Sequence, residues 1–181
     1  MSASRGPGLL IASPQMNDPN FERSVVLLCH HDAQGALGVV INRATQLTVG
    51  EVVDEFEFDI ERSLDDAVLW GGPVEQAAGF VVFPGDIGED VGWFLGNALS
   101  VSPSREMLET VLHGVDPYHL CLGYAGWGPG QLEGEIASGS WLYGDVDKNI
   151  VLEKPVNERW EMALQQLGLR PEMVWMKAID E

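Results

Sequence analysis

Positively charged residues are scarce in this chain of 181 residues, which carries 10 lysines and arginines against 28 aspartates and glutamates. The formal net charge is therefore −18. Nucleic acids and anionic membranes are bound mainly through basic surfaces, so this charge counts against direct binding to either. We expect neither class of partner.

Cysteine and long apolar runs are scarce too. Cys29 and Cys121 are too few for a disulfide framework, and buried free thiols suit a reducing compartment. The apolar run at 9–12 is far shorter than the apolar core of a signal peptide, and no run approaches the roughly 18 apolar residues of a membrane span. These absences predict a cytoplasmic protein.

Familiar catalytic signatures are missing as well. The chain contains no G-x-S-x-G nucleophile elbow, no phosphate-binding loop ending in Lys-Ser or Lys-Thr, and no C-x₂-C zinc knuckle. Carboxylate pairs arise easily by chance among 28 acids, so they identify no acid–base machinery. We therefore predict no cofactor and no catalytic residue, and favour a non-enzymatic function.

What the chain does contain is the composition of a globular domain, with 45% hydrophobic and 21% charged residues. We expect a flexible N-terminal tail at 1–8 and a single domain at 9–181. Residues 48–116 hold fifteen acids and two bases, so most of the negative charge lies in the middle third. Such a region repels polyanions and attracts basic partners, although solubility is its commonest role.

Hydrophobic periodicity and turn residues predict an α+β fold without regular β-α-β alternation. The expected strands cover residues 9–12, 24–30, 36–42, 67–70, 79–83, 99–101, 119–125, 141–143 and 150–152, with a half-buried extended segment at 56–61. The short turn at 32–35 predicts an antiparallel hairpin. The expected helices are one capped by Thr48, one capped by Ser102, one at 131–137 and one from Pro155 to Gly168.

The glycine-rich segment 123–130 lies between an expected strand and an expected helix. Such a turn can bind phosphate through backbone N–H groups. It lacks the last glycine of the dinucleotide pattern, and Glu133 and Glu135 already place negative charge at the start of the helix. A structural bend that lets Trp127 pack is therefore the favoured interpretation over nucleotide binding.

Two Cys and His pairs suggest one further alternative. Cys29 and His31 are two residues apart on one expected strand, as are His119 and Cys121 on another, so each pair would share a face. If the two strands were neighbours in register, the four side chains could surround Zn²⁺. Buried thiols in a core sheet are the simpler explanation, and we predict no metal site.

Four ordered motifs resemble the YqgE/AlgH family of bacterial proteins. They are Phe21-x-x-Ser24-Val25-Val26-Leu27-Leu28-Cys29-x-His31, Gly35-Ala36-Leu37-Gly38-Val39-Val40-Ile41-Asn42, Gly71-Gly72-Pro73-Val74, and Gly123-Tyr124-Ala125-Gly126-Trp127-x-x-Gly130-Gln131-Leu132-Glu133-x-Glu135-Ile136. Together they span nearly the whole chain. The resemblance implies a single α+β domain whose mostly antiparallel, bifurcated sheet folds into a pseudo-barrel with flanking helices.

About activity the resemblance implies little, because family members are commonly labelled transcriptional regulators and have no established catalytic residues. The positions that match its motifs are candidates for one ligand-binding site. They are His31, Asn42, Gly71, Gly72, Pro73, Tyr124, Trp127, Gln131 and Glu135. The same residues could equally determine turns and core packing.

Two hypotheses follow from the sequence. The first is a cytosolic regulator without enzymatic activity, which acts through a protein partner or a small ligand rather than by direct DNA binding. The alternative is an enzyme of unassigned type with a pocket near His31, Gln131 and Glu135.

Overall fold

The computed structural model describes residues 7–85, 91–96 and 98–169. Within these residues, ten strands form one mixed sheet, in the order β10-β1-β2-β3-β9-β6-β8-β7, with β5 attached beside β9 and β4 beside β5. The strands are β1 (Gly8–Ala12), β2 (Val25–Asp32), β3 (Gly35–Val40), β4 (Ala44–Thr48), β5 (Ala67–Trp70), β6 (Val74–Pro84), β7 (Trp93–Phe94), β8 (Leu99–Ser102), β9 (His119–Trp127) and β10 (Trp141–Gly144). All pairings are antiparallel except that of β5 with β9.

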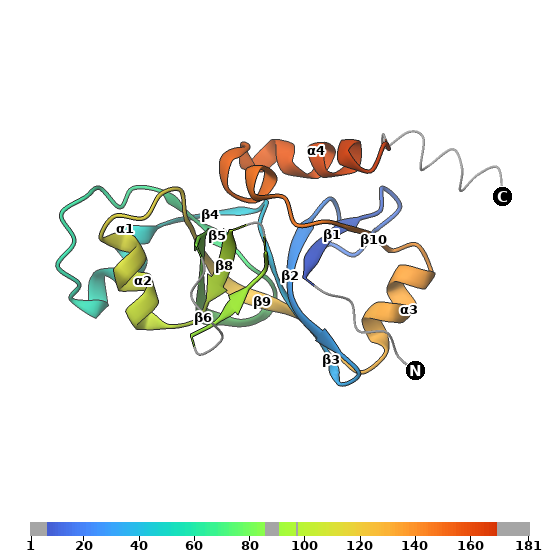
Figure 1. The fold of residues 1–181 in the computed structure, drawn as a ribbon, viewed down its shortest axis with the longest axis horizontal. Coiled ribbons are helices and arrows are strands. Elements are labelled where there is room, and N and C mark those ends of the chain that lie inside the picture. Colours follow the sequence, from blue (N-terminus) through green and yellow to red (C-terminus); the bar gives the residue numbers. More distant parts are fainter. Residues whose placement is uncertain (1–6, 86–90, 97, 170–181) are drawn as a thin grey trace.

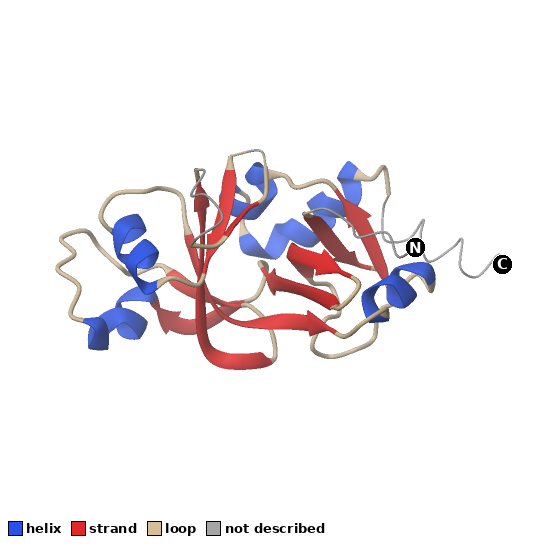
Figure 2. Ribbon diagram, turned by 60° about the horizontal axis from the view of Figure 1, so that its bottom comes forward, coloured by secondary structure: helices blue, strands red, loops and turns tan. Residues whose placement is uncertain are grey.

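Helices cover both ends and one side of the sheet (Figures 1 and 2). They are α1 (Val49–Val53), η1 (Asp54–Phe56), α2 (Arg105–Leu112), α3 (Gln131–Ala137), η2 (Asn149–Glu153), η3 (Val156–Glu158) and α4 (Arg159–Gln166). Figure 1 shows α1 and α2 at one end of the molecule, α3 at the other, and α4 along one side. The fold is therefore a single α+β domain, as the sequence predicts. Among the described residues, no helix is long and apolar enough to cross a membrane.

The first two strands are apolar on both faces because both faces are covered. Leu9 and Leu27 belong to one core cluster, which α4 also joins, whereas Leu10 and Leu28 belong to another, which α3 covers. A strand that is buried on both sides reads as a continuous apolar run, and this is why 9–12 and 24–30 lack alternation. A third cluster lies between α1, α2 and β6.

The sheet branches at β9. Residues 125–127 of this strand pair with β3, while its first half pairs with β5 in parallel and with β6 antiparallel. The backbones approach very closely at the branch: a Cβ on Gly71 would lie 2.3 Å from the carbonyl oxygen of Gly123, and one on Gly123 the same distance from that of Gly72. Gly123 also has φ +81°, which L side chains rarely adopt. The glycines of two motifs thus make the bifurcation possible. Within the described residues, the end strands β10 and β7 do not pair, so the sheet does not close on itself.

Most elements lie where the sequence predicts them. The hairpin of β2 and β3 is antiparallel, and Thr48 caps α1 in a capping box, since Thr48 Oγ1 accepts from Glu51 N while Glu51 Oε1 accepts from Thr48 N. The helix at 131–137 has the expected bounds.

Three local expectations were wrong. Ser104, not Ser102, caps α2, because Ser102 still belongs to β8 and its Oγ accepts from Ser104 N at 3.0 Å. Residues 150–152 form part of the π-helix η2 rather than a strand, because all three apolar side chains turn into the core. The segment 56–61 forms no strand. Phe56 ends the 3₁₀ helix η1 and Phe58 lies in the irregular loop that follows, and both still pack on the third cluster.

Candidate functional site

Four of the candidate residues gather around helix α3. Glu135 lies at its centre: its Oε1 accepts hydrogen bonds from the indole Nε1 of Trp127 and of Trp141, both at 3.0 Å. Its Oε2 accepts from Gln131 Nε2 at 3.0 Å, one helical turn earlier. Gln131 Oε1 in turn accepts from the backbone N–H of Gly128 at 3.0 Å. This Glu135 clamp fastens α3 to the ends of β9 and β10.

The aromatic rings beside the clamp are packed rather than open. The rings of Trp127 and Trp141 meet edge to face with centroids 6.0 Å apart, and Phe21 stacks against Trp127 and meets Trp141 edge-on. Trp127 and Trp141 are 7% and 1% exposed. The glycine-rich bend therefore has the structural arrangement that the sequence favours, with Trp127 packed into the core.

His31 reaches the same helix because of an irregularity in β2. The register with β3 shifts between Leu28 and His30, as in a β-bulge, and the alternation of faces shifts with it. Cys29 remains in the cluster under α4, whereas His31 pairs with Ala36 on the side of α3 and its Nε2 lies 3.2 Å from Glu133 Oε1. The prediction that Cys29 and His31 share a face was wrong for this reason.

Asn42 lies elsewhere, at the end of β3. Its Oδ1 accepts from Val25 N at 2.9 Å, and its Nδ2 donates to the carbonyl oxygen of Arg23 at 2.8 Å. The neighbouring Arg43 donates to the carbonyl oxygens of Pro19 and Glu22. Asn42 and Arg43 thus attach the loop before β2 to the sheet.

The remaining candidates surround the branch of the sheet. Gly71 and Gly72 are buried between the strands that meet there, and Pro73 is exposed just before β6. Tyr124 is partly buried, and its ring meets that of Phe80 edge-on with centroids 5.9 Å apart. The nine candidates accordingly occupy three places, the α3 contact, the end of β3 and the sheet branch.

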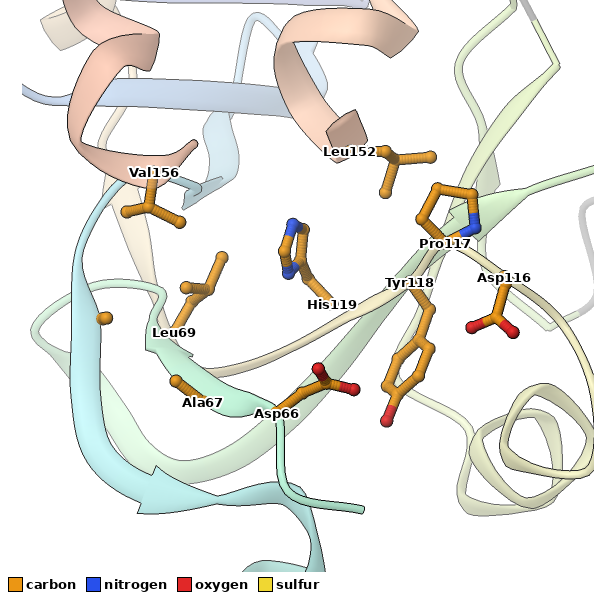
Figure 3. A pocket seen from close by; sticks show the side chains of 10 residues that line it. Asp66, Ala67, Leu69, Asp116, Pro117, Tyr118, His119, Leu152 and Val156 are labelled. Atoms are coloured by element: carbon orange, nitrogen blue, oxygen red, sulfur yellow. The ribbon is translucent and has the colours of Figure 1, made fainter. Parts of the chain in front are cut away.

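A cavity of about 320 Å³ lies at a different part of the molecule, and none of the nine candidates lines it. It opens between β4, β5 and the start of β9 on one side and η2 and η3 on the other (Figure 3). Its lining residues are Ala44, Asp66, Ala67, Leu69, Asp116, Pro117, Tyr118, His119, Leu152 and Val156. Figure 3 shows the imidazole of His119 in the midst of these side chains.

Arg159 holds His119 in place from behind the cavity. Arg159 is 1% exposed, and its guanidinium donates to Ile41 O, to Lys154 O and to His119 Nε2, the last at 2.8 Å. Burial, and then the nearby guanidinium charge, lower the pKa of His119 to about 4. Burial lowers the pKa of Arg159 to about 10, so at neutral pH the arginine is charged and the histidine is neutral.

From the sequence, His119 is a candidate only in the zinc alternative, and Arg159 is not a candidate at all. One signal for the arginine was available. Arg159 stands one turn before Ala163, on the stripe that Trp160 and Leu164 place in the core, and a charged residue on such a stripe needs buried partners. The cavity itself had no local signal, since its walls come from segments as distant as 44 and 156.

The arrangement that the zinc alternative requires is not formed. Strand β3 separates β2 from β9, His31 contacts Glu133, and His119 contacts Arg159. Within the described ranges, no group of three or more His, Cys, Asp or Glu side chains could hold a metal ion. Burial raises the pKa of the Cys121 thiol to about 12 and that of Cys29 further still, so neither is a ready thiolate.

Comparison with known proteins finds relatives of one family over nearly the whole length of this chain. A family model described as AlgH-like matches residues 9–172. A UPF0301 protein of Anaeromyxobacter sp. (strain Fw109-5) is 41% identical over 177 residues, covering 91% of this chain and 89% of its own. One from Photobacterium profundum is 38% identical over 170 residues, covering 90% and 91%.

Solved structures agree with these sequence matches. The solution structure of the AlgH protein from Pseudomonas aeruginosa superposes with a TM-score of 0.75 at 34% identity, covering 96% of each chain. A crystal structure of a Corynebacterium diphtheriae protein gives a TM-score of 0.74 at 25% identity, covering 92% of this chain and 89% of the other.

Proposed function

Since this chain belongs to the AlgH-like family, we propose that it is a non-enzymatic regulatory protein that acts through a protein partner or a small ligand rather than by binding DNA directly. The observation that carries the proposal is the shortage of available positive charge. The net charge is −18, and a protein that reads DNA must neutralise several phosphates.

The folded chain offers even fewer cations than its composition suggests. Arg159 is buried, Arg43 donates to two backbone carbonyls, and Arg62 forms an ion pair with Asp116 at 3.1 Å. These guanidinium groups already have partners inside the protein. Any effect on transcription would therefore be indirect, through binding of another molecule.

The polar residues of the family motifs around α3 also count against catalysis there. Glu135 accepts three hydrogen bonds within the protein, and the Gln131 side chain bonds at both its amide nitrogen and its oxygen. A general base or nucleophile must instead reach a substrate. These contacts favour a structural role for the α3 group over the alternative of an enzyme centred there.

A gel-shift experiment at low ionic strength tests the proposal. Low salt strengthens every electrostatic contact with DNA, so it gives direct binding its best opportunity. We expect no saturable, sequence-selective complex with a randomised duplex pool or with promoter fragments. Enrichment of one sequence by the purified protein, with tight binding that weakens steeply as salt is added, would contradict the proposal.

A further inference from the structure

The cavity beside His119 has the size and the mixed lining of a small-molecule site. Its volume of about 320 Å³ lies at the lower end of the range for ligand pockets, about 300 to 1,000 Å³. Leu69, Leu152 and Val156 provide an apolar wall. The polar lining side chains come from two segments, Asp66 from one and Asp116, Tyr118 and His119 from the other, and a small set of placed polar groups is what fixes the orientation of a ligand.

The contact with Arg159 decides which hydrogen-bonding group His119 offers. A guanidinium only donates, so the Nε2 atom of His119 must accept and carries no proton. The proton of the neutral ring is then on Nδ1, and this N–H makes no hydrogen bond to any described residue. His119 therefore presents one neutral donor, and a ligand needs an acceptor oxygen beside it.

Two carboxylates line the cavity as well, and they are not equivalent. Asp116 forms two contacts with Arg62, at 3.1 and 3.2 Å. The carboxylate of Asp66 has no ion pair or hydrogen bond within the described part of the chain, and Figure 3 shows it directed toward the space beside His119. Asp66 thus offers a negative charge to a cation.

The His119 side and the Asp66 side of the cavity consequently favour opposite charges in a ligand. The buried charge of Arg159 stands behind His119, so the imidazole side favours the electronegative end of a ligand. The Asp66 side favours the cationic end, and no lysine or arginine of the described ranges lines the wall.

We propose that this cavity binds a small organic amine that carries a carbonyl oxygen on an apolar body, with the ammonium at Asp66, the oxygen at His119 and the body against Leu69, Leu152 and Val156. This ligand class specifies the small ligand of the proposed function, and the inference therefore rests on that function.

Isothermal titration calorimetry with four matched compounds tests the chemistry. L-leucinamide has the ammonium, the carbonyl and the apolar side chain. N-acetyl-L-leucinamide lacks the cation, 3-methylbutylamine lacks the carbonyl, and N-acetyl-L-leucine carries a negative charge instead. We expect saturable binding of L-leucinamide, with each compound that lacks one group weaker by roughly fivefold and the anion weakest.

Three variants test whether L-leucinamide binds in the cavity beside His119. Asp66→Asn should weaken L-leucinamide binding by roughly fivefold, because it removes the ion pair. Asp65→Asn is the matched control: it removes the same charge one residue away, from a side chain that bonds Ser63 Oγ and does not line the cavity, so affinity should not change. Ala67→Phe should abolish binding by filling the cavity from an exposed position of β5, while the melting temperature shows that the fold persists.

Equal affinity for N-acetyl-L-leucine, equal effects of the two aspartate substitutions, or binding that survives Ala67→Phe would overturn the inference. So would the absence of saturable binding by L-leucinamide. If DNA binding is also absent, such a result removes the ligand class alone and leaves the proposed function standing. Selective DNA binding contradicts the proposed function whatever the calorimetry shows.

Discussion

Removing the carboxylate of Glu135 should destabilise the whole protein, and the structure gives the size of the effect. The substitution Glu135→Ala leaves two indole N–H groups without acceptors, on side chains that are 7% and 1% exposed. An unsatisfied buried donor costs about 1 to 3 kcal/mol. Water can reach the partly buried end of α3, so we take the lower part of the range and expect a loss of about 3 kcal/mol for the two together.

That loss is large beside a typical total stability of about 5 to 15 kcal/mol. In a domain of this length it corresponds to a melting temperature lower by about 6 to 12 °C. Glu135→Gln keeps one oxygen for the indoles but turns an amide toward Gln131, so it should cost about 2 kcal/mol. Urea unfolding followed by tryptophan fluorescence measures all three proteins.

The matched control deletes a glutamate that makes only an exposed contact. Glu109 on α2 lies 3.9 Å from His113, and both side chains are about half exposed. Glu109→Ala should change the free energy of unfolding by no more than about 0.5 kcal/mol. If Glu135→Ala were as mild as Glu109→Ala, the clamp would contribute little to stability, and Glu135 would again be a candidate for a functional role.

Three further outcomes are expected. The free energy of unfolding of the wild type should fall as the pH is lowered from 6.5 to about 4, because within this window His119 binds a proton in the unfolded chain but not in the folded one. In urea titrations at several pH values, His119→Gln should lose about 3 kcal/mol of that pH dependence. Gly123→Ala should lower stability by about 3 kcal/mol or prevent folding, whereas Gly126→Ala on the same strand, where a Cβ meets nothing closer than 3.6 Å, should cost no more than about 1 kcal/mol; equal melting temperatures would refute the close approach at the branch. His31→Ala should lower the melting temperature by several degrees, because it empties a buried site; an unchanged melting temperature together with loss of a measurable turnover would favour the enzyme alternative.

The sequence predicts those parts of the fold that local patterns determine. The strands at 9–12 and 24–30, the helix cap at Thr48 and the helix at 131–137 depend on nearby residues, and all are found. Errors arise where distant parts of the chain decide. The apolar residues 150–152 suit a strand by composition, yet they form a π-helix whose side chains pack in the same core cluster as those of α4.

The candidate residues show the same limit. Their places in strands and turns follow from the sequence, but the shift in β2 that carries His31 to the face of α3 has no pattern to reveal it. The contact of Arg159 with His119 joins residues forty positions apart. Since the cavity is assembled from such distant contacts, only the folded chain shows it.

The motif residues hold the fold, whereas the ligand that we propose binds at the His119 cavity. The most direct test is a nitrogen-15 NMR titration of the labelled protein with L-leucinamide. We predict saturable shifts of the backbone amides of Ala67, Leu69 and His119, with the indole signal of Trp127 unmoved. Shifts centred on Trp127 and Gln131, or no saturable shift at all, would contradict the claim.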